Sequence, residues 1–187
     1  MSSFDRARVS FAVGAVAFFI GLIVLLGMRT PPPPLINGDQ LGQDPGESFS
    51  AYEQRAEDSL AALRGEENSF ALVTFAQPLG PDDAAEVLEP VGRVNAMTVA
   101  SAPARSLPEP TSGETRADVF TRELDRIAAS LSGIGNVPTP DTFNGVVVWD
   151  VPDVLRMLDD DPAVATVEAL PPDAAWGLFG VSPVVVD

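Results

Sequence analysis

The chain of 187 residues contains 11 arginines and no lysine against 27 acidic residues, so its formal net charge is −16 at pH 7. An acidic surface of this kind disfavours binding to nucleic acid and to anionic lipid headgroups. Cysteine and histidine are both absent, which excludes disulfides, thiolate nucleophiles, cysteine-based metal sites and proton transfer by histidine. We therefore expect a protein that is not an enzyme and that uses neither a cofactor nor a metal ion.

Residues 11–28 form an uninterrupted apolar run without a charge. At about 1.5 Å per residue this run covers roughly 27 Å, close to the hydrocarbon thickness of a bilayer. Arg6 and Arg8 precede the run and only Arg29 closely follows it, so the positive-inside rule predicts that residues 1–10 are a cytoplasmic tail and that the rest is extracytoplasmic. A cleaved signal peptide is the alternative, but the apolar run is longer than usual and lacks a small-residue cleavage motif.

Two further features bear on the setting of this predicted transmembrane helix. Ala17 and Gly21 are spaced as a small-xxx-small pair, which favours close approach of two membrane helices, although such pairs also arise by chance in segments rich in Ala and Gly. A homodimer through the span is thus one hypothesis. The absence of lysine together with abundant Ala, Pro, Asp and Arg is typical of GC-rich bacterial coding, and salt adaptation is the alternative. We expect an uncleaved signal-anchor in a bacterial cell envelope.

A linker is expected over residues 29–47, because residues 31–34 are four prolines that form a stiff extended spacer and a Gly- and Asp-rich stretch follows them. An amphipathic juxtamembrane helix then begins near Ser48 and ends near Gly65. Its apolar stripe consists of Phe49, Tyr52, Ala56, Leu60 and Leu63. We prefer the interpretation that this helix packs on its own domain. The alternative is a stalk that pairs with a partner helix.

The next segments predict a first strand, helix, strand unit. Residues 70–75 are rich in residues that favour strands, and a turn is expected over residues 77–80. Pro81 suits the first position of a helix that Pro90 halts. Residues 94–100 are the second strand of the unit.

A loop and an inserted helix follow. Residues 101–113 contain three prolines and no apolar period, so we expect a loop that is either functional or disordered. A strong amphipathic helix is then predicted over residues 114–132. Its apolar positions are Ala117, Phe120, Leu124, Ile127 and Leu131.

A second strand, helix, strand unit completes the domain. Residues 143–150 predict a strand with an apolar centre, Pro152 opens a short helix, and residues 164–168 predict the last strand. Two such units in series indicate an α+β fold, the ferredoxin-like split βαβ sandwich, in which the helix between the units is an insertion. We expect this domain to occupy residues 48–168.

The second unit carries a family pattern: a strand that starts with Phe-Asn-Gly, a short helix bearing leucines, and an Asp-Pro turn into a valine-rich strand. The positions concerned are Phe143, Asn144, Gly145, Leu155, Leu158, Asp161, Pro162, Val164, Val167 and Glu168. In this pattern residues 143–168 resemble the C-terminal half of the subtilisin propeptide family, also called inhibitor I9 domains. The resemblance implies a ferredoxin-like fold and inhibition of a subtilisin-like protease, whose cleft receives the segment after the last strand.

Few side chains are candidates for a site. Residues 159–161 are three consecutive aspartates, which we interpret as a solvated turn, because they lack the alternation and the distal glutamate of a calcium loop. Trp149 is expected to pack in or beside the sheet. The apolar tail, residues 169–187, contains Trp176, Leu178 and Phe179, which we predict as partner-binding residues if the tail is exposed. Folding of the tail back onto the sheet is the commoner outcome for such a segment.

The sequence thus favours a non-enzymatic, single-pass membrane protein whose extracytoplasmic domain binds another protein of the envelope. The alternative is a membrane-tethered inhibitor or folding helper of a subtilisin-like protease. A hydrolase based on paired carboxylates ranks last, because no motif supports it.

Overall fold

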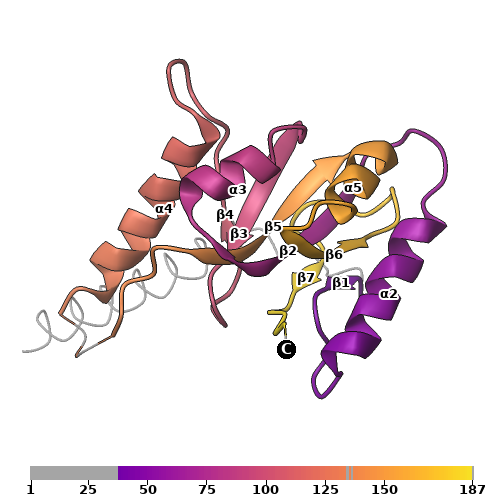
Figure 1. The fold of residues 1–187 in the computed structure, drawn as a ribbon, viewed down its shortest axis with the longest axis horizontal. Helices are drawn as coiled ribbons and strands as arrows, with labels where there is room; N and C mark the ends of the chain where they lie inside the picture. The colour runs from indigo at the N-terminus through magenta and orange to yellow at the C-terminus, as the bar shows by residue number, and fades with distance from the viewer. Residues whose placement is uncertain (1–37, 134, 136, 187) are drawn as a thin grey trace, which may run out of the picture. The chain divides into compact units, whose positions relative to one another are not determined.

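The computed structural model describes residues 38–133, 135 and 137–186. Its centre is a five-stranded antiparallel sheet with the strand order β4-β3-β5-β2-β6. The elements in chain order are β1 (Gln40–Leu41), α2 (Phe49–Ala62), β2 (Ser69–Leu79), α3 (Pro81–Val87), β3 (Arg93–Thr98), β4 (Arg105–Ser106), α4 (Arg116–Leu131), β5 (Phe143–Asp150), α5 (Pro152–Asp159), β6 (Val164–Ala169) and β7 (Gly180–Val181). The predicted α+β class is confirmed (Figure 1).

Each of the four helices in the described part of the chain begins at a capping side chain or at a proline in its first turn. The Ser48 side chain accepts a hydrogen bond from the Ala51 amide at the start of α2, and Thr115 and Asp118 form a reciprocal capping box at the start of α4. Pro81 and Pro152 occupy the first turns of α3 and α5, where proline costs no helical hydrogen bond. Each of these starts was predicted within two residues.

Two strand, helix, strand units build the sheet, as predicted. The first is β2-α3-β3 and the second is β5-α5-β6, and α4 is inserted between them. Strands β2 and β5 are antiparallel neighbours at the centre of the sheet, with Phe70 opposite Trp149 and Val73 opposite Val146. This register decides which side chains share a face, because alternate residues of a strand point to opposite sides.

One face of the sheet is covered by helices. Alternate residues of the central strands, such as Val73 and Val146, pack there with apolar residues from α2, α3, α4 and α5. Phe143 lies at the middle of this core, with its ring centroid 4.9 Å from that of Phe120 and 5.7 Å from that of Phe75. Helix α2 additionally packs along the edge strand β6, where the Ser59 hydroxyl accepts a hydrogen bond from the Ala169 amide.

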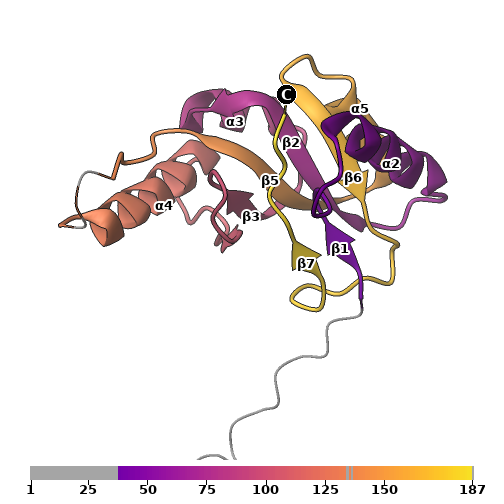
Figure 2. The same cartoon turned by 90° about the horizontal axis from the view of Figure 1, so that it is seen from below.

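The opposite face of the sheet is covered by the two ends of the described chain. Figure 2 shows β1 and β7 on the side of the sheet away from α3 and α5. A second apolar core lies here, formed by Leu41, Phe70, Leu72, Ala96, Val147 and Leu170, with Phe179, Val181 and Val184 packed against it. Both faces of the central strands are therefore buried, which explains why residues 70–75 are almost continuously apolar instead of alternating.

Three boundaries differ from the sequence predictions. The expected turn at residues 77–80 is wrong, because β2 continues to Leu79, which pairs with Phe143 beyond a register shift. The loop at residues 101–113 contains β4, an edge strand that pairs with β3. Residues 38–47, expected to be linker, contain β1, which pairs in parallel with β7. The folded domain thus begins earlier than residue 48 and includes much of the predicted tail.

The stripe predicted for α2 is confirmed at four of its five positions, and the fifth, Phe49, is half-buried. Tyr52, Ala56 and Leu60 are buried, and Leu63 is buried just after the helix. The predicted transmembrane helix at residues 11–28 lies outside the described residues. Among the residues that the structure does describe, no helix combines the length and the apolar character needed to cross a bilayer.

Candidate functional site

The predicted partner-binding residues lie in a tail that folds back onto the sheet. Phe179 directly precedes β7 and is half-buried against the second core. Leu178 is also half-buried, and its amide donates a hydrogen bond to the Ala175 carbonyl. Trp176 keeps 42% of its surface exposed. The tail is therefore packed, and Trp176 is the most exposed of these three residues.

Trp176 belongs to an aromatic patch, which we define as Phe70, Trp149, Trp176 and Phe179. The buried Phe70 ring lies at its centre, with centroid distances of 6.3 Å to Trp149, 5.7 Å to Trp176 and 5.2 Å to Phe179. Trp176 and Phe179 meet edge to face at 5.8 Å. These separations and tilts are those of favourable aromatic pairs, so the rings hold one another in place.

The two tryptophans give the patch its exposed surface. Trp149 is 42% exposed, the same fraction as Trp176, although the sequence prediction only placed it in or beside the sheet. Tryptophan is among the residues most enriched at the energetic centres of protein interfaces. The pairing of Phe70 with Trp149 across β2 and β5 was not predicted, because strand register cannot be deduced from two isolated strands.

A short parallel ribbon holds the tail in place. The Gly180 amide donates to the Asp39 carbonyl at 3.1 Å, and the Ser182 amide donates to the Leu41 carbonyl at 2.7 Å. The ribbon is joined to the main sheet because the Gly42 amide donates to a carboxylate oxygen of Glu168, at 2.5 Å. Because Phe179 directly precedes β7, the ribbon and its attachment to β6 help to hold Phe179 in place.

Glu168 is the centre of an ion-pair network that joins three parts of the chain. It is 3% exposed on β6 and accepts hydrogen bonds from Gly42 and from the Arg55 guanidinium of α2. Arg55 also donates to the Gly42 carbonyl at 2.9 Å and pairs with Glu47 at 2.8 Å. We call Arg55, Glu168, Glu47 and Gly42 the ionic lock. The sequence analysis did not predict this network; the one signal that could have indicated it is a single acidic residue, Glu168, in the otherwise uncharged strand β6.

The ionic lock shifts the pKa of both carboxylates, in opposite directions. Burial raises the pKa of Glu168, and the Gly42 amide and Arg55 oppose that shift without cancelling it. The hydrogen bond from Arg55 is the main reason that the pKa of Glu47 falls to about 2. Arg55 thus compensates the buried carboxylate of Glu168 and also pairs with the more exposed carboxylate of Glu47.

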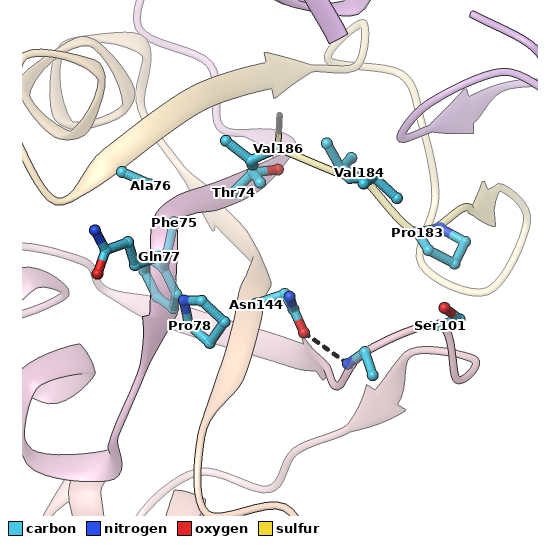
Figure 3. A pocket seen from close by; sticks show the side chains of 12 residues that line it. Thr74, Phe75, Ala76, Gln77, Pro78, Ser101, Asn144, Pro183, Val184 and Val186 are labelled. Atoms are coloured by element: carbon cyan, nitrogen blue, oxygen red, sulfur yellow. Dashed lines mark hydrogen bonds between the residues drawn. The ribbon is translucent and has the colours of Figure 1, made fainter. Parts of the chain in front are cut away.

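A cavity of about 400 Å³ lies beside the second core (Figure 3). It lies where β2 separates from β5, between Thr74 and Pro78, and the C-terminal residues 183–186 form its other wall. Asn144 of β5 and Ala100 also line the cavity, and the Asn144 side chain accepts a hydrogen bond from the Ala100 amide at 2.6 Å. Among the described residues that line the cavity none is ionisable, so the lining offers no acid, base or charged nucleophile for catalysis.

Of the three aspartates at residues 159–161, Asp159 ends α5, and Asp160 and Asp161 lie in the turn between α5 and β6; the predicted turn therefore begins one residue later than expected. A carboxylate oxygen of Asp161 accepts a hydrogen bond from the Ala163 amide at 2.8 Å, which is the usual way in which an aspartate stabilises a turn. Burial raises the pKa of Asp159. Within the described part of the chain, no three acidic side chains are grouped in a way that could hold a metal ion.

Comparisons with known proteins give no relative. No protein-family model matches the sequence, no curated protein matches it significantly, and no solved structure matches the fold significantly. The aromatic patch, the ionic lock and the cavity therefore have to be interpreted from their own chemistry.

Proposed function

We propose that the chain is a non-enzymatic, single-pass membrane protein of a bacterial envelope whose extracytoplasmic domain binds another protein through the aromatic patch. The observation that carries this proposal is the pair of half-exposed tryptophans, Trp149 and Trp176, fixed on the buried ring of Phe70. Leaving this much indole surface in water is unfavourable, at roughly 25 cal/mol per Å². A partner that covers both rings recovers that free energy.

The way in which the patch is built supports the same proposal. Its residues come from β2, from β5 and from the tail. The ionic lock and the β1–β7 ribbon attach the tail to the sheet, beside the residues from β2 and β5. A preassembled aromatic surface binds with a smaller entropy cost than one that must form on contact. The apolar run at residues 11–28 supports the membrane setting of the domain through its length and its lack of charge.

The strand arrangement supports the finer description of the fold as a ferredoxin-like split βαβ sandwich. The four strands of the two units lie in the order β6-β2-β5-β3, with antiparallel neighbours throughout. The resemblance of residues 143–168 to subtilisin propeptides agrees with this description. Inhibition of a protease is the weaker proposal, because the segment that enters the protease cleft in that family is packed on the sheet here. Fold alone indicates no activity.

Site-specific photocrosslinking tests the proposal. A photoreactive phenylalanine analogue replaces Trp176 in the full chain, in cells that keep their native membranes. We expect a discrete crosslinked product, because this ring lies at the proposed interface. Met157 is the matched control position, since it is 57% exposed on α5, which covers the opposite face of the sheet.

The control separates a specific interface from general stickiness. The analogue at position 157 should give no product of the same mass. Identical patterns from positions 176 and 157, or a set of abundant bystanders from both, would show that the aromatic patch has no dedicated partner.

A further inference from the structure

We propose that the segment of the partner that covers the aromatic patch is basic and presents arginine, whose guanidinium group stacks on the exposed indole faces. This inference rests on the proposed function and specifies the partner's chemistry. It depends on three observations: the exposed surface of the two tryptophans, the exposed acidic residues that lie near patch residues in the sequence, and the contact of an arginine with an aromatic ring elsewhere in this domain.

The indole faces provide the first part of the argument. The plane of the Phe70 ring is inclined by 37° to that of Trp149 and by 35° to that of Trp176. Each tryptophan residue remains 42% exposed. The face of an indole carries negative electrostatic potential, and it attracts a cation more strongly than any other side-chain ring. A planar guanidinium fits such a face better than an ammonium, because it stacks flat and is less strongly hydrated.

Acidic residues lie near the patch residues along the chain. Glu66 and Glu67 are exposed in the turn just before β2, which carries Phe70, and Asp173 is exposed just before Trp176. Arg93 lies opposite Trp149 in the register of β3 and β5, but it forms an ion pair with Glu109 at 2.7 Å. Among the ion pairs of the described residues, none involves Glu66, Glu67 or Asp173, so these carboxylates favour a basic segment over an acidic one.

The domain already contains one contact of the proposed kind. The Arg55 guanidinium carbon lies 5.2 Å from the centroid of the Tyr52 ring, and the same group pairs with Glu47 and Glu168. An arginine that stacks on an aromatic ring and pairs with flanking carboxylates is thus stable in this acidic environment. The patch offers the same combination on its outer surface.

Titration with short peptides tests the inference directly. The chain has only two tryptophans, and both are in the patch, so the intrinsic fluorescence of the full chain in nonionic detergent reports binding at this surface alone. The probes are an arginine–serine peptide and three matched peptides in which lysine, citrulline or glutamate replaces arginine. We expect the arginine peptide to shift the tryptophan emission, the lysine peptide to bind more weakly, and the citrulline and glutamate peptides to bind at least about tenfold more weakly. Added salt should weaken the arginine complex.

Variants make the outcome specific to the patch. Trp176→Ala should weaken the arginine peptide about fivefold, read from Trp149, and Met157→Ala should have no effect. The double variant Glu66→Gln, Glu67→Gln leaves all four rings intact and should also weaken binding, which keeps the test valid if the loss of Trp176 disturbs the fold. Equal affinity for the arginine and citrulline peptides, or no binding of either, overturns the inference. If position 176 still crosslinks to a protein in membranes, the proposed function survives that result.

Discussion

Replacing Gly42 with alanine is expected to destabilise the domain by about 3 kcal/mol. Gly42 has a φ of +96°, a conformation that disfavours any side chain, and a Cβ atom there would lie 2.1 Å from the Ser182 carbonyl oxygen. The backbone must move to relieve this overlap. That movement separates β1 from β7 and withdraws the Gly42 amide from the Glu168 carboxylate, so a charged group loses a hydrogen bond in a buried place.

Urea denaturation of the full chain, followed by tryptophan fluorescence, measures this effect. Gly46→Ala is the matched control, because Gly46 has a similar φ of +85° but open space around the position of its Cβ. The control variant should lose only about 1 kcal/mol, from the conformational preference alone. Equal losses in the two variants would mean that the contact between Gly42 and Ser182 does not hold the ribbon.

Removing the cation of the ionic lock is the second large change. Arg55→Met is expected to cost about 2 to 3 kcal/mol at neutral pH, because it leaves Glu168 buried without its partner. The value lies below the usual range for a fully buried pair, since the Arg55 side chain is itself 36% exposed. Adding Glu168→Gln to this variant should restore much of the loss, because the buried position then carries no charge. An unchanged loss in the double variant would contradict this account of the lock.

The loss in Arg55→Met should also depend on pH in a defined direction. The folded-state pKa of Glu168 lies above its ordinary value, so the folded state favours the protonated form of this carboxyl group. The stability that Glu168 contributes in this way is fully present below about pH 4.5 and disappears as pH rises through the folded-state pKa. The folded-state pKa of Glu47 falls to about 2, so its contribution is present at neutral pH and disappears as pH falls from about 4.5.

Both trends reduce the contribution of Arg55 to the free energy of unfolding at acidic pH. Without Arg55 the pKa of Glu168 rises further, and protonation then relieves the unpaired charge. The difference between the wild type and Arg55→Met in urea denaturation should therefore shrink between pH 7 and about pH 4. A difference that grows on acidification would show that Arg55 stabilises the domain by packing and not through the two carboxylates.

The regular elements were predictable because their signals are local. The strand over residues 143–150 and the helix after Pro152 follow from apolar runs, proline positions and turn residues that lie within a few positions of each other. The two-unit plan of the fold follows from the order of these elements. By contrast, the end of β2 was misplaced because residues 77–80 were predicted as a turn, while the strand continues to Leu79 past a register shift.

The candidate site was predictable only in part, because its contacts connect distant parts of the chain. Trp176 and Phe179 were identified from their apolar surroundings in the tail, but nothing local indicates that Phe70 and Trp149 lie beside them. The strands β1 and β7 are two residues each and carry no periodicity. Their pairing depends on a glycine conformation at Gly42 and on the buried charge of Glu168, and neither can be assigned a partner from sequence alone.

Parallel crosslinking from Trp149 and Trp176 tests most directly whether the two indoles form one binding surface. The two residues are distant in sequence and reach the patch from β5 and from the tail. With the photoreactive analogue placed at each position in turn in native membranes, mass spectrometry should identify the same partner protein and overlapping, arginine-containing segments of it. Products from different proteins, or from separate regions of one protein, would contradict the claim that a single aromatic patch binds a single partner.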